Sequence, residues 1–209
     1  MASSEVDWDS VYRSNYLATA FSEVHWIAKA RDLYESARKL EPAMEKVWDS
    51  YRARAKNLSS PLEPDHFNGP YFMLMAFAVE NLLKAAAVSR NSFKYKESFS
   101  PKSQFPKELK THYLFELGQA LNLNVTRDEE DLLRRLTRSA IWFGRYPAPL
   151  EYSETSGTGV FSDGKEYQVS WFGREDVNKL RIFINGLPAR LELPTQYWKS
   201  AEDTEHDVA

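Results

Sequence analysis

The feature that most constrains this chain is a run of twenty residues, YFMLMAFAVENLLKAAAVSR, at positions 71–90. Before the terminal Ser89 and Arg90, its only strongly polar positions are Glu80, Asn81 and Lys84. A helix that is hydrophobic nearly all round belongs at the centre of a helical bundle. Charged residues near the middle of the run would be costly in lipid, so the sequence favours a buried core helix over a membrane span.

Hydrophobic residues recur every three or four positions on both sides of this run, which predicts further helices. One long helix is expected over 17–40. Glu41-Pro42 interrupts it, because the residue before proline disfavours the helical region and proline suits a first helical position, and a second helix then covers 44–55. The proline-containing stretches 59–70 and 91–110 are expected to be a connection and a long loop.

Three more helices are expected towards the C-terminus. Thr111 is predicted to cap a short helix that carries Leu114, Leu117 and Leu121 on one face. Thr126 and Glu129 have the spacing of a capping box, which starts a helix that should stop by Gly144. The last helix is expected over 174–187, with Gly186-Leu187-Pro188 as its stop.

The pattern changes to an alternation of apolar and polar residues around Tyr167, and Asp163-Gly164 supplies a tight turn, which predicts a small β-hairpin at 158–172. The expected fold class is therefore all-α. It is an antiparallel bundle of about six helices with long N-terminal helices and a hairpin insertion before the last helix. Residues 1–58 are expected to be an N-terminal extension packed on a 70–190 helical domain, and 200–209 an acidic disordered tail.

Composition narrows the classes of function. The 209 residues contain no cysteine, which removes disulfides, thiolate nucleophiles and cysteine metal sites and fits a reducing compartment. The acidic start shows no secretory signal, so a cytoplasmic location is expected. The four histidines have no metal-ligand spacing, and neither a glycine-rich phosphate loop nor a serine nucleophile elbow is present, so no metal or cofactor is predicted.

The polar residues of the central run are the first candidates for a site. Glu80 and Lys84 are four residues apart in the order that favours an ion pair, and a buried charge must be paired. They are expected either to satisfy each other, with His112 or Arg145 nearby, or to line a polar cleft. His112 falls in the first turn of its predicted helix, where the helix dipole favours a neutral imidazole that can accept a proton; the alternative is a structural hydrogen bond at the helix end.

The predicted loop 91–110 is a second candidate. Cations that include Lys94, Lys96 and Lys102 alternate there with Phe93, Tyr95, Phe99 and Phe105. Cations hold phosphates and aromatic rings stack on unpaired bases, which is the combination that single-stranded nucleic acids require. Aromatic residues in a long loop also anchor such a loop to the core, so this alternative stays open.

Three segments in order, FAVENLLKAAAV (77–88), KTHYLFELGQAL (110–121) and LTRSAIWFGRYPAP (136–149), together resemble the HEPN superfamily. The resemblance covers roughly residues 70–187. It implies an all-α, usually dimeric domain of prokaryotic toxin–antitoxin or defence systems that interacts with RNA or nucleotides, many members being metal-independent endoribonucleases. By position it carries over Glu80, Lys84, His112, Arg145 and Tyr146 as a polar site or dimer seam.

The Arg-x4-6-His motif of the family's nucleases is missing here, because no histidine has an arginine at that spacing before it. Enzymatic activity is therefore left open. The favoured hypothesis is a HEPN-like protein that binds RNA or a nucleotide-related partner without efficient catalysis. The alternatives are a metal-independent endoribonuclease that uses His112 and Arg145, and a dimeric protein–protein interaction module. Expected partners are RNA or a nucleotide, a second copy and a nucleotidyltransferase, with no membrane.

Overall fold

The computed structural model describes residues 6–100, 102, 105–149, 152, 158–168 and 172–198. These residues are mainly helical, as expected of the all-α class. The α-helices are α1 Trp8–Ala20, α2 Glu23–Arg38, α3 Glu41–Lys56, α4 Asn68–Ser98, α5 Leu114–Ala120, α6 Arg127–Arg138 and α7 Arg174–Arg190. Shorter elements are the 3-10 turns η1 Lys107–Leu109 and η4 Thr195–Tyr197, the π-helical turn η2 Ser139–Phe143, and the strands β1 Thr158–Val160 and β2 Glu166–Gln168.

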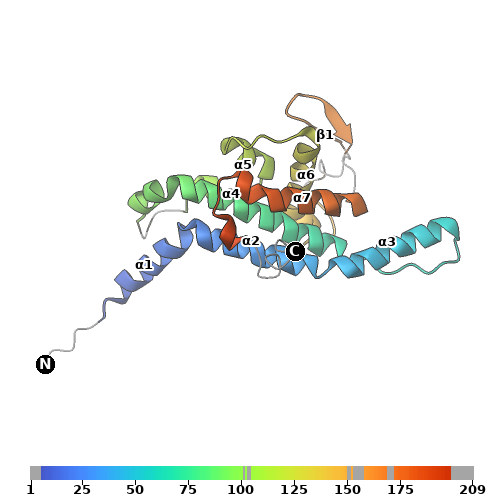
Figure 1. Ribbon diagram of the computed structural model, residues 1–209, viewed down its shortest axis with the longest axis horizontal. Helices are drawn as coiled ribbons and strands as arrows, with labels where there is room; N and C mark the ends of the chain where they lie inside the picture. The colour runs from blue at the N-terminus through green and yellow to red at the C-terminus, as the bar shows by residue number, and fades with distance from the viewer. Residues whose placement is uncertain are drawn as a thin grey trace, which may run out of the picture.

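Helix α4 is the centre of the fold. It packs most extensively against α2 and also contacts α5, α6, α7 and η2 (Figure 1). Its length and hydropathy match those of a membrane span, yet 72% of its most apolar window is buried by the rest of the chain. The expectation of a core helix at 71–90 is therefore confirmed. Helices α2, α5, α6 and α7 contribute to the same hydrophobic core.

The predicted single helix over 17–40 is wrong, because the chain breaks between α1 and α2. Phe21 leaves the helical conformation and is buried among aromatic rings, 5.5 Å from the ring of Tyr95 and 6.0 Å from that of Phe105. Two side chains bind carbonyl groups that the break exposes: Trp26 Nε1 donates to Ala20 O, and Ser92 Oγ donates to Phe21 O. The second predicted helix is confirmed as α3, with Pro42 in its first turn.

Helix α4 is longer than predicted at both ends. Its first turn includes Gly69 and Pro70, which were expected to belong to the preceding connection, and this is compatible with proline because a first turn does not use its N–H groups. At the other end, residues 91–98 are helical rather than part of a long loop. Tyr95 explains this continuation, since it is buried in the core and extends the apolar face by two turns.

The two short stretches Leu121–Leu123 and Leu191–Leu193 end α5 and α7 in the same way. In each, the middle residue, Asn122 or Glu192, has a positive φ, and the amide of the following leucine donates to a carbonyl five residues earlier. This is a Schellman motif, with the two leucines buried. The predicted stop of the last helix at Gly186-Leu187-Pro188 is therefore wrong: Pro188 lies inside α7, which ends at Arg190.

Helix α6 starts with the predicted capping box, in which Thr126 Oγ1 accepts from Glu129 N and Glu129 Oε2 accepts from Thr126 N. The helix continues through the π-helical turn η2 and ends at Gly144, as expected. Strands β1 and β2 pair antiparallel, with Gly159 opposite Tyr167 and Gly164 at positive φ in the turn. Residues 169–171 of the expected hairpin and the 200–209 tail lie outside the described residues.

Buried and partly buried carboxylates connect these elements. Arg135 donates to Asp131 and, across to α7, to Asp176, each at 2.8 Å. Glu130 accepts from Arg134 Nε and from the backbone and hydroxyl of Ser162 in the β-turn. Burial opposes ionisation of Asp176 and Glu130, but these hydrogen bonds outweigh it, so the pKa of each carboxyl lies below its ordinary value.

We predict acid-sensitive stability from these two groups. A pKa that is lower in the folded state than in the unfolded state stabilises the protein above the unfolded pKa, and that stabilisation is lost as the pH falls through the folded value. Asp176→Asn should lower the free energy of unfolding by about 1.5–3 kcal/mol at pH 7. It should also flatten the fall of that free energy below about pH 5.

Urea unfolding between pH 3 and 7 measures both effects. Asp32→Asn is the control, because Asp32 is exposed and its only ion pair in the described residues spans 3.8 Å to Lys29. If the free energy of unfolding of Asp176→Asn falls with pH in parallel with that of the native chain, the prediction is contradicted.

Candidate functional site

The Glu80–Lys84 pair lies on the buried side of α4. Lys84 Nζ is 2.5 Å from Glu80 Oε1, and the two side chains are 6% and 7% exposed. The ion pair expected from their spacing is therefore confirmed. The indole of Trp26, on α2, lies 6.0 Å from Lys84 Nζ and adds a cation–π contact.

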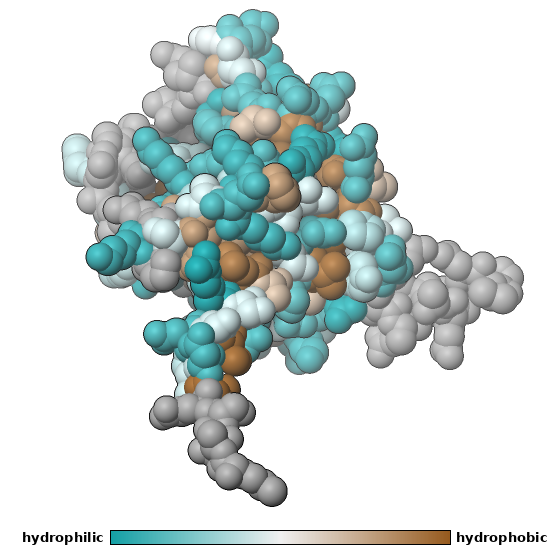
Figure 2. Space-filling view, turned by 90° about the vertical axis from the view of Figure 1, so that its left-hand side faces the viewer, coloured by the Kyte–Doolittle hydropathy of each residue, from teal (hydrophilic) through white to brown (hydrophobic). Residues whose placement is uncertain are grey.

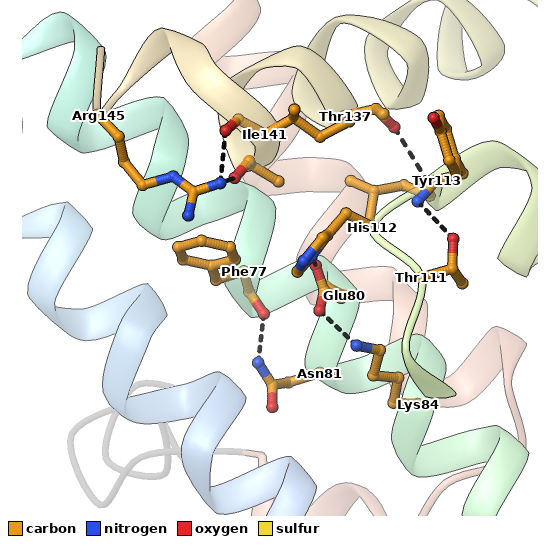
Figure 3. Close-up of polar contacts among 12 residues, drawn as sticks. Phe77, Glu80, Asn81, Lys84, Thr111, His112, Tyr113, Thr137, Ile141 and Arg145 are labelled. Atoms are coloured by element: carbon orange, nitrogen blue, oxygen red, sulfur yellow. Dashed lines mark hydrogen bonds and ion pairs between the residues drawn. The ribbon is translucent and has the colours of Figure 1, made fainter. Parts of the chain in front are cut away.

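His112 completes this cluster from a different part of the chain. Its Nδ1 is 2.8 Å from Glu80 Oε2, and its side chain is 45% exposed. Figure 3 shows the imidazole and the ammonium group of Lys84 on the two oxygens of one carboxylate. The three residues form what we call the Glu80 cluster, in which a buried acid is bound by a buried base and a partly exposed histidine.

The expected position of His112 in the first turn of a helix is wrong. Helix α5 begins two residues later, at Leu114, and Thr111 accepts a hydrogen bond from Tyr113 N rather than capping the helix. The amide of Leu114 donates instead to Thr137 Oγ1 on α6. His112 therefore lies on an extended segment that is fixed on both sides, and this segment directs the imidazole towards α4 (Figure 3).

This geometry determines which nitrogen of His112 carries the proton. An ionised carboxylate only accepts hydrogen bonds, so Nδ1 must donate to Glu80. A neutral imidazole then has its lone pair on Nε2, as in catalytic sites where a carboxylate orients a histidine. In that tautomer, the Glu80 cluster presents a hydrogen-bond acceptor at a partly exposed position with a fixed orientation.

Arg145 does not join the Glu80 cluster among the contacts of the described residues. Its Nη2 donates to Ala140 O at 2.6 Å and to Ile141 O at 2.5 Å, so it caps the end of the π-helical turn. Figure 3 shows it near Phe77, whose ring centroid lies 6.3 Å from that of His112. The guanidinium also lies 5.6 Å from the ring of Tyr146, which is 47% exposed.

The lysines of the predicted loop lie elsewhere. Lys94 and Lys96 are exposed on the last turns of α4, and Lys102 is exposed beyond it. Their aromatic neighbours Tyr95, Phe99 and Phe105 pack on the core, which favours the alternative that these rings anchor the segment. Burial and a hydrogen bond with Glu108 raise the pKa of Tyr95. Phe93 is the exception, at 74% exposed.

Sequence reasoning missed two residues that shape the Glu80 cluster. Trp26 covers Lys84, and Thr137 holds the start of α5 through its hydroxyl, which in turn donates to Leu133 O. Neither residue is part of a recognisable motif, because both act across helices that the fold brings together. In the described part of the chain, no group of three or more histidine, aspartate or glutamate side chains is arranged to hold a metal ion.

Comparisons with protein-family models, with curated proteins and with solved structures find no match to this chain. A proposal of function for this chain therefore rests on the chemistry of the Glu80 cluster and its surroundings.

Proposed function

We propose that the surface around His112 binds single-stranded RNA or a nucleotide-related ligand, without efficient catalysis. The observation that carries this proposal is the partly exposed imidazole, fixed by a buried carboxylate. Tyr113, next to His112 in the chain, has an exposed ring, and the exposed ring of Tyr146 lies 5.6 Å from the guanidinium of Arg145. Exposed aromatic rings next to a cation and a hydrogen-bond acceptor suit unpaired bases and their phosphates.

The biological setting is part of the same proposal. The three segments that together resemble the HEPN superfamily contain the residues of the Glu80 cluster. The role that we propose for this HEPN-like bundle, in a toxin–antitoxin or defence system, is consistent with RNA binding. Efficient cleavage is not proposed, because the resemblance lacks the Arg-x4-6-His motif. In addition, Nη2 of Arg145 is already bonded to two backbone carbonyls.

We predict that Tyr113→Ala and His112→Ala weaken the binding of a labelled single-stranded RNA. One stacked base is worth about 1–3 kcal/mol, so Tyr113→Ala should raise the dissociation constant by about 5-fold to 150-fold. Fluorescence anisotropy in EDTA at fixed salt measures this, since salt changes such affinities strongly. His66→Ala, which alters an exposed histidine in the α3–α4 connection, is the control. Unchanged binding by both site variants would contradict the proposal.

Metal-independent RNA cleavage is the second candidate function, favoured by the contact between Glu80 Oε2 and His112 Nδ1. A histidine held in this way is suited to take a proton from a ribose 2′-hydroxyl. The same mixtures of protein and labelled RNA, resolved on denaturing gels, distinguish the two functions. Cleavage that disappears in His112→Ala favours the nuclease, and retained RNA that stays intact with the native chain favours binding.

A further inference from the structure

Helix α1 contacts the core towards its C-terminal end, through Leu17, Ala20 and Tyr16, whereas its N-terminal end at Trp8 is exposed. It has thirteen residues, none of which is buried, and it projects from the helical core towards the N-terminus (Figure 1). Isolated helices of this length are marginal in water, and helices in proteins depend on packing an apolar face. Figure 2 shows hydrophobic surface on the low projection that α1 forms.

The uncovered face of α1 is aromatic. Trp8, Tyr12 and Tyr16 are spaced four residues apart and are therefore on one side of the helix, with exposed fractions of 59%, 66% and 42%. The rings of Trp8 and Tyr12 are 6.1 Å apart. We call these three residues the α1 stripe. Large exposed apolar patches of this kind are typical of interaction sites.

A pocket of about 250 Å³ opens at the base of the α1 stripe. Its wall includes Tyr16, Phe21, Lys94, Tyr95, Phe99 and Phe105. Tyr16 thus belongs both to the stripe and to the pocket, and its ring lies 5.1 Å from that of Phe99. The outer end of the stripe, at Trp8, is two helical turns away and is far from this pocket in its own chain, about 12 Å along the helix axis.

We propose that α1 pairs with the α1 of a second copy of this chain, antiparallel and with Tyr12 near the twofold axis. In this register, Trp8 of each copy meets Tyr16 of the other and enters the pocket beside it. The contact is self-complementary, as a twofold interface requires, because stripe and pocket are joined at Tyr16. Each pocket is then completed by an aromatic side chain that its own chain cannot supply.

Charge supports a second copy as the occupant. Asp9, beside Trp8, and Lys94, in the pocket wall, have no ion-pair partner within the described residues, and Glu108, the acid in the same wall, is hydrogen-bonded to Tyr95. The proposed pairing would bring Asp9 of one copy to Lys94 of the other. Nucleic acid is a poorer occupant for the stripe, because Asp7 and Asp9 at its outer end repel phosphates.

The oligomeric state tests this proposal. Sedimentation velocity of the full chain across a range of concentrations should show a dimer, and Trp8→Ala with Tyr12→Ala should raise the dimer dissociation constant at least about tenfold. The thermal midpoint of the dissociated protein should stay unchanged, because α1 buries no residue in a single chain. Tyr51→Ala, which removes an exposed ring from α3, is the matched control. A monomer at all concentrations, or a dimer insensitive to the stripe variants, would overturn the proposal.

Cysteine cross-linking tests whether Tyr12 lies close to the twofold axis. The chain has no cysteine, so Tyr12→Cys introduces a single thiol per copy close to the twofold axis. Mild oxidation should give a covalent dimer from Tyr12→Cys and little from Tyr51→Cys, since a disulfide needs Cα atoms within about 7 Å. Equal cross-linking of the two variants would overturn the placement of Tyr12 at the twofold axis. RNA binding by the stripe variants should match that of the native chain, which separates this test from that of the His112 surface.

Discussion

Glu80→Ala is expected to lower the free energy of unfolding by about 3–5 kcal/mol, because it leaves the ammonium group of Lys84 buried without its counter-ion. Lys84 is only 6% exposed on its side chain, so water cannot replace the lost carboxylate. His112 loses its orienting partner at the same time. For a chain of this length, each kcal/mol of lost stability lowers the thermal midpoint by roughly 2–4 °C.

The double variant Glu80→Leu with Lys84→Met isolates the cause. It removes both charges and fills the site with apolar groups, so it should recover most of the lost stability. Glu116→Ala is the control, because Glu116 is an exposed carboxylate that pairs with Arg134 at 3.4 Å, and its loss should cost less than about 1 kcal/mol. If Glu80→Ala unfolds at the same urea concentration as Glu116→Ala, the buried pair does not have this energetic role.

The parts of the fold that sequence predicted well are those that depend on short-range interactions. The capping box at Thr126 and Glu129 lies within a single turn, so residue types three apart were sufficient to place the start of α6. The apolar run of α4 is equally local, since its composition alone requires burial.

The parts that could not be predicted depend on tertiary contacts. The α1–α2 break has no proline or glycine; Phe21 leaves the helix because its ring is buried against Tyr95 and Phe105, far along the chain. Residues 91–98 stay helical for the same reason, although polar residues surround Tyr95 there. Burial of one aromatic side chain outweighs the local pattern in both cases.

The candidate site divides in the same way. The Glu80–Lys84 pair follows from its i,i+4 spacing, so sequence placed it correctly. The contact between His112 and Glu80 joins residues 32 positions apart. Only the family resemblance of the three segments indicated that these two residues belong to one site. Arg145 was expected near the pair, yet its hydrogen bonds to described residues go to carbonyl groups of its own helix, which a pattern of residue types does not show.

Gly144→Ala is the second substitution with a large expected effect. A Cβ at this position would lie 2.4 Å from Met73 Cβ and 2.8 Å from Gly69 O, both on α4. Gly144 has a φ of −86°, which alanine adopts freely, so the cost comes from packing and not from the backbone conformation. We expect a loss of about 1–3 kcal/mol or more in the free energy of unfolding, because neither Met73 Cβ nor a helix carbonyl can move away independently.

Gly186→Ala is the matched control for this prediction. Gly186 lies inside α7, where an added Cβ meets nothing within 4 Å. Alanine should therefore raise the free energy of unfolding by about 0.5–1 kcal/mol, so the two glycine variants are expected to shift the urea midpoint in opposite directions. Shifts of the same sign and size would show that α4 and the end of η2 are not in close contact. Because Arg145 follows Gly144 directly, Gly144→Ala should also disturb the bonds of the guanidinium to Ala140 O and Ile141 O and weaken RNA binding, whereas Gly186→Ala should leave that binding unchanged.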